Sequence, residues 1–540
     1  HGKKFTPKEN IKADIIILGC SLPGIVTAHK LNKKFGDTIN IVVLDLAGKQ
    51  TKSTSQCNVG FQEEELSDTG IYSFDGNARQ LINNVARHYL AIFARDFNIS
   101  LPESIITPDN YTAPFSKLFE YSNGQTVSCT NDFHDFDYLN FLERFELNQY
   151  QTLLDQSMRD LFQTNSVDAA SETLKLLYYD KTTMEQHICG ALLLPNSRQI
   201  MRTMVRLVCG VPSNTVSVLF YLHQCYRTSS IKNHLGGHNT RFREKLLGYC
   251  RKHLANKLQQ SVADITFSAK SIKEIRSYRN KQVILTTIQG ETNYICNLLA
   301  MALKPDELND IYVEANLLSE KEAAIAKLMK KGRAKKFMVQ YEESFWREQG
   351  YSGDILSMRG PILWAMERPK LSTVGSSERF PSLVGYLMIK DNREENSKEA
   401  VIKQLVKLFG EEAKNPLSYK EMYIADVFVP RCGDYVALRK LTNEACRKNL
   451  EWGALDIFAD GDVAAALEAG NTAYLHLLSC LRPQAQTYED AVSGAWPTFI
   501  NDSYFDTWFS KLNIVKSVQL IALTAAIYFG IRLVKTLRQN

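Results

Sequence analysis

The sequence predicts a mixed α/β protein, α+β overall, and three observations carry this prediction. A β-branched run at 14–18 is followed by a glycine-containing turn, a helical pattern and a second strand, which is the order of a parallel βαβ unit. Strand-like runs near both ends of the chain bracket a largely helical middle. The 540 residues (61.3 kDa) exceed what one ordinary core contains, so two or three domains are expected.

The composition is that of a globular protein with balanced charge. Hydrophobic residues make up 44% of the chain, and 64 basic against 59 acidic residues leave a net charge of +5. This balance argues against nucleic acid as a partner. A basic cluster within 327–336 is interpreted as a solvated helix face or turn rather than a binding patch. The 11 cysteines form no Cys-x-x-Cys pair, which predicts no metal site and favours a reducing compartment.

The βαβ unit has the features of a dinucleotide-binding turn. In a Gly-x-Gly-x-x-Gly turn, backbone amides and a helix N-terminus meet a pyrophosphate, and the glycines leave room for its approach. The turn here keeps Gly19 and Gly24 but has Ser21 at the middle position. Asp45 ends the second strand about twenty residues beyond the turn, where a carboxylate binds an adenosine ribose. A plain βα corner is the alternative interpretation.

Further elements are expected along the rest of the chain. Helices are predicted over 139–150, 199–209, 397–408 and 461–478. Strands are predicted over 39–45, 283–288, 294–299, 336–341, 383–389 and 424–429. This order indicates a discontinuous, Rossmann-like cofactor domain that is interrupted by a second domain.

The C-terminal region predicts a transmembrane helix. Residues 517–531 carry no charge, and the apolar stretch extends to 512–534 if Lys516 and Arg532 place their charges at the membrane surface. About 20 residues at ~1.5 Å per residue cover roughly the ~30 Å hydrocarbon core. Aromatic residues precede the stretch and basic residues follow it, as at a membrane interface. A buried terminal helix is the alternative.

Three separated segments resemble the monoamine oxidases, which are flavin-containing amine oxidases. The run Tyr341-Glu342-Glu343-Ser344-Phe345-Trp346-Arg347 resembles the Tyr-x-Glu-x-Phe-Trp segment of that family. Residues 216–225, with Gly236-Gly237 beyond them, resemble its Val-Ser-Ala-Leu helix and Gly-Gly loop. Ala466-Leu467-Glu468-Ala469-Gly470 is similar to the Ala-Val-Glu-Ala-Gly that opens its last flavin-facing helix. The C-terminal anchor is similar to the membrane tail of the family.

The resemblance implies a discontinuous FAD-binding domain with an inserted substrate domain. The expected FAD-binding segments are 1–90, 226–305 and 426–482. The expected substrate-domain segments are 91–225, which is mainly helical, and 306–425. A tail at 483–511 then leads to the anchor at 512–534.

The resemblance also assigns roles to single residues. Lys336 matches the lysine that holds a water near the flavin N5, with simple membership of the basic cluster as the alternative. Cys432 matches the cysteine that forms a thioether to the flavin. However, Val429-Pro430-Arg431 replaces the Ser-Gly-Gly of the family, which argues against covalent attachment. The complete set of predicted FAD-binding residues is Gly19, Ser21, Gly24, Asp45, Gly236, Gly237, Cys432, Gly461 and Asp462.

The substrate cage of the family is altered in this sequence. Two tyrosines of that cage face each other in front of the flavin, and the matching positions hold Gly433 and Asp462. A carboxylate at Asp462 makes a neutral aromatic slot polar unless it is protonated or paired. The Gly-Gly-Arg after the second strand is also replaced, by residues 49–53. Ordinary amine oxidase activity is therefore expected to be lost or redirected.

The leading hypothesis is a membrane-anchored, FAD-dependent oxidase that acts on an amine or related small substrate and forms hydrogen peroxide. One alternative is a catalytically inactive relative that serves as a membrane-tethered interaction protein. A further alternative is a flavin oxidase of the prenylcysteine oxidase kind. The expected partners are the membrane and a second copy or another protein. The resemblance implies the mitochondrial outer membrane, with the body in the cytosol; a membrane of the secretory pathway is the alternative.

Overall fold

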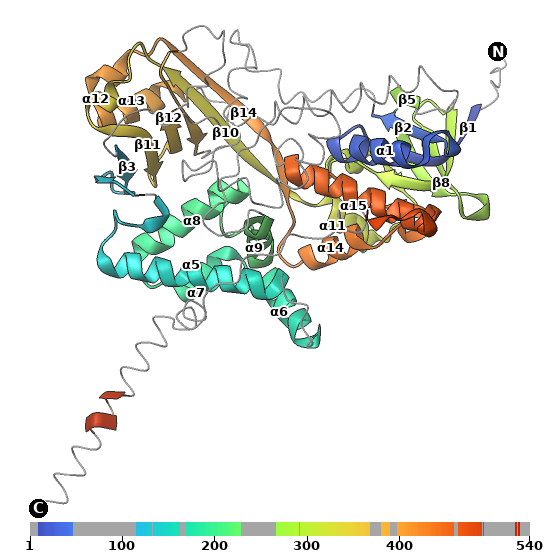
Figure 1. Cartoon of the computed structure of the whole chain (residues 1–540), viewed down its shortest axis with the longest axis horizontal. Helices are drawn as coiled ribbons and strands as arrows, with labels where there is room; N and C mark the ends of the chain where they lie inside the picture. The colour runs from blue at the N-terminus through green and yellow to red at the C-terminus, as the bar shows by residue number, and fades with distance from the viewer. Residues whose placement is uncertain are drawn as a thin grey trace, which may run out of the picture.

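The computed structural model describes residues 9–46, 115–131, 133–162, 169–227, 266–269, 271–290, 292–367, 380–388, 397–457, 463–488, 490, 524–525 and 527–529. These residues form two β-sheets and a layer of helices (Figure 1). One sheet lies at the right of the view and carries α1 and α15. The other lies at the upper left, above the helical layer α5–α9.

The first sheet is built around the strand β1 (Glu9–Leu18). It pairs in parallel with β2 (Ile41–Asp45) and β8 (Thr292–Met301). The strand order is β5-β2-β1-β8-β7-β6-β9, and β15 also pairs with β8. The remaining strands are β5 (Thr266–Ala269), β6 (Ile272–Ser277), β7 (Val283–Thr287), β9 (Tyr312–Val313) and β15 (Leu450–Glu451). The carboxyl ends of β1, β2 and β8 therefore meet at one edge.

The two faces of β1 are buried against different layers. Ile15 and Ile17 pack with α1 (Leu22–Phe35) and α15 (Val463–Leu481), while Ile16 and Leu18 point into the largest core cluster. All four side chains are 0% exposed. Alternate residues of a strand face opposite sides of its sheet, and a central parallel strand is covered on both. The apolar run from Ile15 to Leu18 is continuous because β1 is buried on both faces of the sheet.

The second sheet has seven strands in the order β14-β10-β13-β12-β11-β3-β4. Its strands are β3 (Ser116–Glu120), β4 (Thr126–Cys129), β10 (Lys330–Gln340), β11 (Tyr351–Ser357), β12 (Ile362–Glu367), β13 (Ser382–Leu387) and β14 (Ser418–Val429). The helices α12 (Phe345–Glu348) and α13 (Lys398–Phe409) pack against it through a separate core cluster. The segment 91–225, predicted to be mainly helical, also supplies β3 and β4.

The interpretation of the basic cluster as a helix face or turn is wrong for residues 330–336, which belong to β10. Lys335 is 5% exposed, because its ammonium group pairs with the Glu421 carboxylate and donates to the Ser397 hydroxyl at 3.1 Å. A buried lysine is tolerated only when its charge is matched in this way. The matching carboxylate comes from a strand more than 80 residues away, so the local sequence does not show it.

The helical layer contributes many residues to the largest core cluster. Its helices are α5 (Phe141–Phe162), α6 (Ala169–Lys181), α7 (Met184–Ala191), α8 (Pro195–Cys209) and α9 (Val218–Arg227), with α11 (Glu320–Lys327) and α14 (Tyr435–Asn443) beside them. The predicted helices at 139–150, 199–209, 397–408 and 461–478 are confirmed as α5, α8, α13 and α15. The 216–225 motif forms most of α9, where Leu219, Phe220 and Tyr221 are at most 1% exposed.

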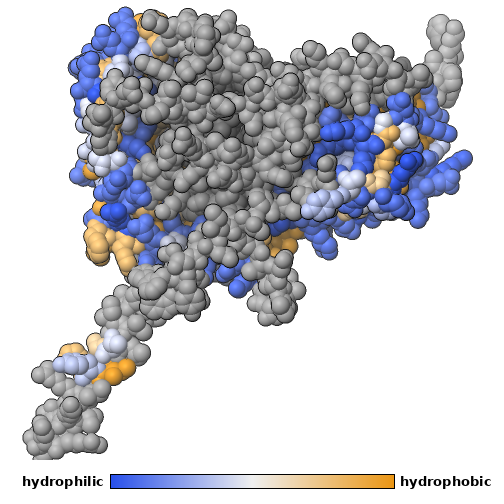
Figure 2. Space-filling view, in the orientation of Figure 1, coloured by the Kyte–Doolittle hydropathy of each residue, from blue (hydrophilic) through white to orange (hydrophobic). Residues whose placement is uncertain are grey.

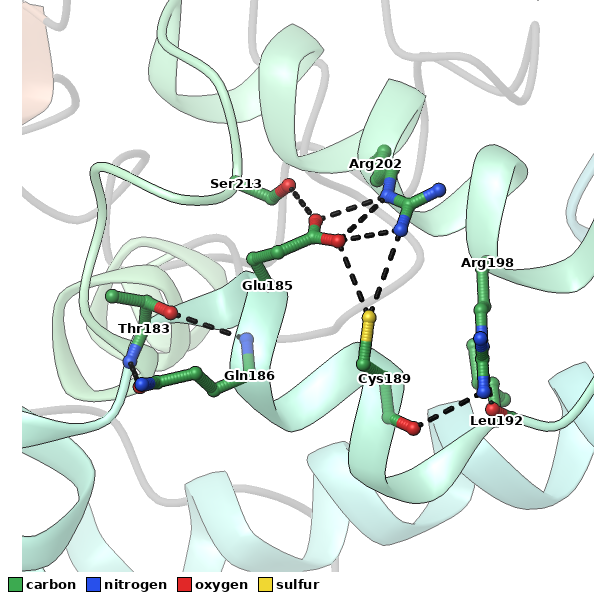
Figure 3. A network of polar contacts seen from close by, with 8 residues as sticks. All are labelled: Thr183, Glu185, Gln186, Cys189, Leu192, Arg198, Arg202 and Ser213. Atoms are coloured by element: carbon green, nitrogen blue, oxygen red, sulfur yellow. Dashed lines mark hydrogen bonds and ion pairs between the residues drawn. The ribbon is translucent and has the colours of Figure 1, made fainter. Parts of the chain in front are cut away.

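A charged clamp joins α7 to α8 and to the loop after it (Figure 3). The Glu185 carboxylate accepts from Arg202 Nε at 3.0 Å, from Arg202 Nη2 at 2.5 Å and from the Ser213 hydroxyl at 2.6 Å. The Cys189 thiol also donates to Glu185 at 3.3 Å. Hydrogen bonds from Arg202 and Ser213 favour the ionised carboxylate and lower the pKa of Glu185 to about 2.

This clamp predicts a stability loss in acid. The pKa of Glu185 falls from an ordinary value of 4.5 to about 2 on folding, so its contribution is complete above pH 4.5 and disappears as the pH falls toward 2. The pair is partly exposed, and solvent screening reduces the contribution to about 1 kcal/mol. We expect Glu185→Gln to lower the free energy of unfolding by about that amount at pH 7 and by almost nothing near pH 2, as measured by urea denaturation.

The matched control is Glu411→Gln, because Glu411 forms an exposed pair with Lys414 and is expected to contribute almost nothing to the stability.

His187 also makes the stability depend on pH, and it does so equally in both variants because both retain it. Burial lowers its pKa to about 4, so it adds a loss as the pH falls from 6.5 to 4. Equal pH profiles for Glu185→Gln and the native protein between pH 7 and 2 would contradict the role of the clamp.

An exposed apolar patch lies at the beginning of α5. Phe141 and Leu142 are 78% and 64% exposed, and Phe145, whose ring stacks on Phe141, is 39% exposed. The patch is visible as an orange area at the lower left of a largely hydrophilic surface (Figure 2). Clustered large apolar side chains of this kind mark contact surfaces for proteins or lipids.

The predicted transmembrane helix at 512–534 falls outside the described residues, apart from 524–525 and 527–529. No helix within the described part of the chain has the length and apolar character to cross a bilayer. The described side chains Ile527, Tyr528 and Phe529 are between 53% and 64% exposed.

Candidate functional site

The turn between β1 and α1 lies at the carboxyl edge of the first sheet and is closed by Ala302 at the end of β8. The Gly19 amide donates to the Leu44 carbonyl at 2.8 Å, and the Ala302 amide donates to the Leu18 carbonyl at 2.8 Å. Gly19 has φ +108, and a Cβ there would lie 2.1 Å from the Ala302 carbonyl oxygen. A Cβ on Gly24 would lie 2.6 Å from the Ala302 Cβ. Both positions therefore require glycine.

Ser21 occupies the position of the middle glycine of the turn. Its hydroxyl points toward β8 and donates to the Ala302 carbonyl at 2.7 Å. Ser21 is the N-cap of α1, but its side chain accepts no hydrogen bond from the helix, and the first turn contains no acidic residue. Among the described residues, no side-chain cap is formed at this helix N-terminus, and its amides can meet an anionic group as in a phosphate-binding turn.

The helix α15 packs directly on this turn. A Cβ on Gly470 would lie 2.7 Å from the Pro23 carbonyl oxygen and 2.7 Å from Val26 Cγ1. The Thr27 hydroxyl donates to the Gly470 carbonyl at 3.0 Å. The Ala-Leu-Glu-Ala-Gly motif therefore holds α15 close against α1. The two helices are neighbours in Figure 1.

Asp45 lies beside the turn, as the sequence predicts. It is the last residue of β2, one position after Leu44, whose carbonyl accepts the Gly19 amide. The register pairs Leu18 with Leu44, so the two strands end side by side. Gly19, Ser21, Gly24 and Asp45 are thereby gathered at one edge, where α/β sheets bind nucleotides.

Sequence reasoning missed three residues of this edge. Ala302 forms hydrogen bonds with Leu18 and Ser21 on the two sides of the turn. In the sequence, Ala302 could be noticed only as a small residue near the end of a predicted strand. Asp456 is 1% exposed, and its amide donates to the Leu303 carbonyl at 2.9 Å. Burial, together with the neighbouring Asp306 and Asp456, raises the pKa of Glu307. Both carboxyl groups follow strands of the first sheet, which the sequence alone did not place next to the turn.

Lys336 lies in a different sheet from the glycine turn. Its backbone pairs with Tyr386 of β13 and with Met422 of β14 in the second sheet. The role of Lys336 near a flavin stays a prediction.

Cys432 is held in the loop between β14 and α14. Its thiol donates to the Asp180 carbonyl of α6 at 3.2 Å, and burial raises its pKa. The Asp180 carboxylate accepts from the amides of Tyr435 and Val436 at 3.2 and 2.9 Å and so caps α14. A protonated thiol in such a loop is a poor nucleophile.

Gly433 follows in the same loop with φ +94, and its amide donates to the Asp180 carbonyl at 2.8 Å. A tyrosine at this position would be strained, because the left-handed region disfavours residues with a side chain. The backbone conformation at Gly433 therefore favours glycine over the tyrosine that the family has at the matching cage position. The remaining predicted residues Gly236, Gly237, Gly461 and Asp462 lie outside the described residues.

The Phe-Trp segment, which contributed strongly to the resemblance, is structural. Trp346 is 0% exposed, and its indole Nε1 donates to Glu367 at 3.0 Å. Tyr341 and Phe345 pack around it edge to face, and the Tyr341 hydroxyl donates to the Ala413 carbonyl at 3.0 Å. The segment therefore positions β10 and α12 against α13 and the turn that follows it.

The two-sheet fold and the glycine turn define an α/β protein that binds a dinucleotide cofactor. The profile of the flavin containing amine oxidoreductase family matches residues 114–437, which is more than half of the chain. The protein belongs to this family, and FAD is the cofactor that membership implies.

Curated relatives agree with this assignment. A probable flavin-containing monoamine oxidase A of Dictyostelium discoideum is 24% identical over 253 residues, covering 45% of this chain and 53% of the relative. The flavin-containing amine oxidase A of Sus scrofa is 22% identical over 426 residues, covering 76% and 72%. The match thus spans about half of the first relative and nearly three quarters of the second.

Solved structures show the same fold. Putrescine oxidase bound to putrescine superposes with a TM-score of 0.63 at 13% identity, covering 87% of this chain and 100% of that structure. Cyclohexylamine oxidase from Brevibacterium oxydans gives a TM-score of 0.60 at 16% identity, covering 88% and 100%. At these identities the likeness concerns the fold.

The described residues fit the adenosine diphosphate half of FAD. A side chain at Gly19 or Gly24 would collide with Ala302, the Ser21 hydroxyl is turned away, and the N-terminus of α1 carries no acidic residue. These residues would hold the pyrophosphate, and Asp45 would bind the ribose.

Proposed function

We propose that this protein is an FAD-dependent oxidase that acts on a small amine or a related substrate and forms hydrogen peroxide. The glycine turn at Gly19–Gly24 is the observation that carries the proposal, because it leads into the N-terminus of α1, where Ser21 forms no side-chain cap and the first turn has no acidic residue. FAD supplies the site that accepts hydride equivalents from the substrate and passes electrons to oxygen. Family membership and the similarity to amine oxidases support an amine as the substrate class.

We further propose that FAD is held without a covalent bond. The Cys432 thiol is engaged with the Asp180 carbonyl, and its raised pKa keeps it protonated. Thioether formation needs a free and nucleophilic sulfur.

The visible spectrum of the detergent-purified protein tests both proposals. We expect a flavin band that moves entirely into the supernatant after acid precipitation, and we expect Cys432→Ser to keep the same ratio of flavin to protein. A preparation with bound flavin should release peroxide with at least one member of a panel of small amines. A flavin that stays in the acid pellet of the native protein, but not of Cys432→Ser, would show that covalent attachment occurs.

A second candidate function is favoured by the backbone at Gly433. Its φ of +94 excludes a tyrosine at one cage position. An inactive, membrane-tethered interaction protein would retain the fold with this loop. Absence of a flavin band after expression with ample riboflavin would favour this candidate over the oxidase.

The apolar stretch at 512–534 is proposed as the membrane anchor, and the mitochondrial outer membrane is the proposed location. The support is the uncharged core at 517–531 with its flanking aromatic and basic residues. Alkaline extraction of membranes from cells that express the full chain, or a chain ending at residue 511, tests this proposal. Release of the full chain into the soluble fraction would contradict it.

A further inference from the structure

A second group of chemically reactive side chains lies near the carboxyl end of α15, away from the glycine turn. It consists of two thiols, a buried carboxylate and an imidazole: Cys446, Cys480, Glu451 and His476. Cys446 precedes β15, and Cys480 is the next-to-last residue of α15. Both cysteines are reduced in the structure.

The two cysteines meet over the last turns of α15. The Cys446 thiol donates to the His476 carbonyl at 3.6 Å. Residues four apart lie on one helix face, and this carbonyl points along the helix toward residue 480. Cys480 lies one helical turn after His476 on the same face of α15, and it is among the groups that raise the pKa of Cys446. Cys446 is 8% exposed, whereas Cys480 is open to solvent.

Glu451 places a proton acceptor beside the buried thiol. This carboxylate is 0% exposed and accepts from the Cys446 amide at 2.9 Å and from the Gly453 amide at 2.6 Å. His476 Nδ1 lies 2.9 Å from the same carboxylate, and the imidazole side chain is 18% exposed. Burial, together with Cys480 and Glu451, raises the pKa of Cys446, so its sulfur is protonated at rest.

The backbone around Cys446 is strained. Cys446, Lys448 and Asn449 have φ values of 45, 51 and 64, although none of them is glycine. Such conformations cost about 1 kcal/mol or more each and persist where other contacts enforce them. The Glu451 carboxylate holds the Cys446 amide, and Asn449 donates to the Lys281 carbonyl.

We propose that Cys446 and Cys480 form a redox site in which a peroxide converts the two thiols to an intramolecular disulfide. The exposed thiol reacts first, and the buried thiol resolves the product. The disulfide would fasten the end of α15 to the loop before β15. The helix α15 also packs through Gly470 on the glycine turn that is proposed to bind FAD, so one helix contacts both the redox site and that turn.

The chemistry balances with hydrogen peroxide as the oxidant. The Cys480 sulfur attacks one peroxide oxygen, the O–O bond breaks, and the products are a sulfenic acid and one water. The Cys446 sulfur then attacks the Cys480 sulfur, the S–O bond breaks, and the hydroxyl leaves as a second water. Glu451 accepts the Cys446 proton in this step, and the departing hydroxide takes a proton from solvent to become the second water. His476 connects the carboxylate to solvent, to which Glu451 releases its proton. Peroxide can come from any source, so the site does not depend on oxidase activity of this protein.

Peptide mapping without reduction, on full-length protein treated with hydrogen peroxide and then alkylated, tests the proposal. We expect a linked peptide pair that joins Cys446 to Cys480, a loss of two titratable thiols per chain, and reversal by a dithiol. In Cys446→Ser, we expect Cys480 to accumulate as a sulfenic acid that dimedone traps, because the resolving thiol is missing. Cys189→Ser is the matched control, since Cys189 is another exposed thiol on a helix and its loss should leave the linked pair unchanged.

Three outcomes would overturn the proposal. One is the oxidation of Cys480 in the native protein with no linked peptide. Another is a disulfide that joins Cys480 of two separate chains. The third is equal dimedone labelling of the native protein and Cys446→Ser. Thermal unfolding of each variant before treatment shows that the chains compared are folded, and none of these outcomes bears on whether the flavin site is active.

Discussion

Gly24→Ala is expected to reduce the FAD content of the purified protein by about tenfold or more. The new Cβ would lie 2.6 Å from the Ala302 Cβ and 2.8 Å from the Gly19 carbonyl oxygen, so the turn or the end of β8 must move. Overpacking of this kind costs about 1–3 kcal/mol, and every 1.4 kcal/mol lost from binding is a factor of about ten in affinity. The ratio of flavin to protein absorbance measures the loss.

Two variants separate this effect from general damage. Gly190 lies in α7 with nothing within 4 Å of an added Cβ, so Gly190→Ala should keep the full FAD content. Ser21→Gly restores the middle glycine and removes only the hydrogen bond to Ala302, so it should bind FAD at least as tightly as the native protein. FAD lost from Ser21→Gly, or full FAD content in Gly24→Ala, would contradict the assignment of the turn.

The elements that the sequence predicted well are those whose signal is local. The strand, turn, helix and strand from 14 to 45 could be read from one short segment, because the apolar run and the glycines are adjacent. The same segment did not show which way Ser21 points. Its acceptor is the Ala302 carbonyl, which is 281 positions away. The sequence therefore showed that serine replaces the middle glycine, but not that the serine hydroxyl is bonded to the end of β8.

Long-range pairing also explains the errors. The basic cluster was predicted to be solvated because six basic residues fall within ten positions, yet Glu421 of the neighbouring strand β14 pairs with the buried Lys335. The role of Cys432 could not be decided locally either, since the acceptor of its thiol belongs to α6. At position 433 the sequence shows glycine where the family has a tyrosine. Only the backbone φ angle shows that the conformation of this loop favours glycine there.

Trp346→Ala is expected to lower the free energy of unfolding by about 3–5 kcal/mol, the range for removing a buried aromatic side chain. The indole is 0% exposed, lies 5.0 Å from the Phe345 ring centre and donates to the Glu367 carboxylate at 3.0 Å. Arg347 donates to the same carboxylate oxygen at 2.7 Å, so part of the Glu367 charge stays compensated in the variant. Urea denaturation followed by far-UV circular dichroism gives the change.

Tyr488→Ala is the control, because its ring is 84% exposed and its loss should change the stability by less than about 0.5 kcal/mol. Trp346→Phe should fall between the two, since it keeps an aromatic ring and loses the bond to Glu367. A loss below about 1 kcal/mol for Trp346→Ala would show that the Phe-Trp segment is not a packing element. A large loss together with an unchanged ratio of flavin to protein in the folded fraction would separate the structural role of this segment from cofactor binding at the turn that contains Gly19.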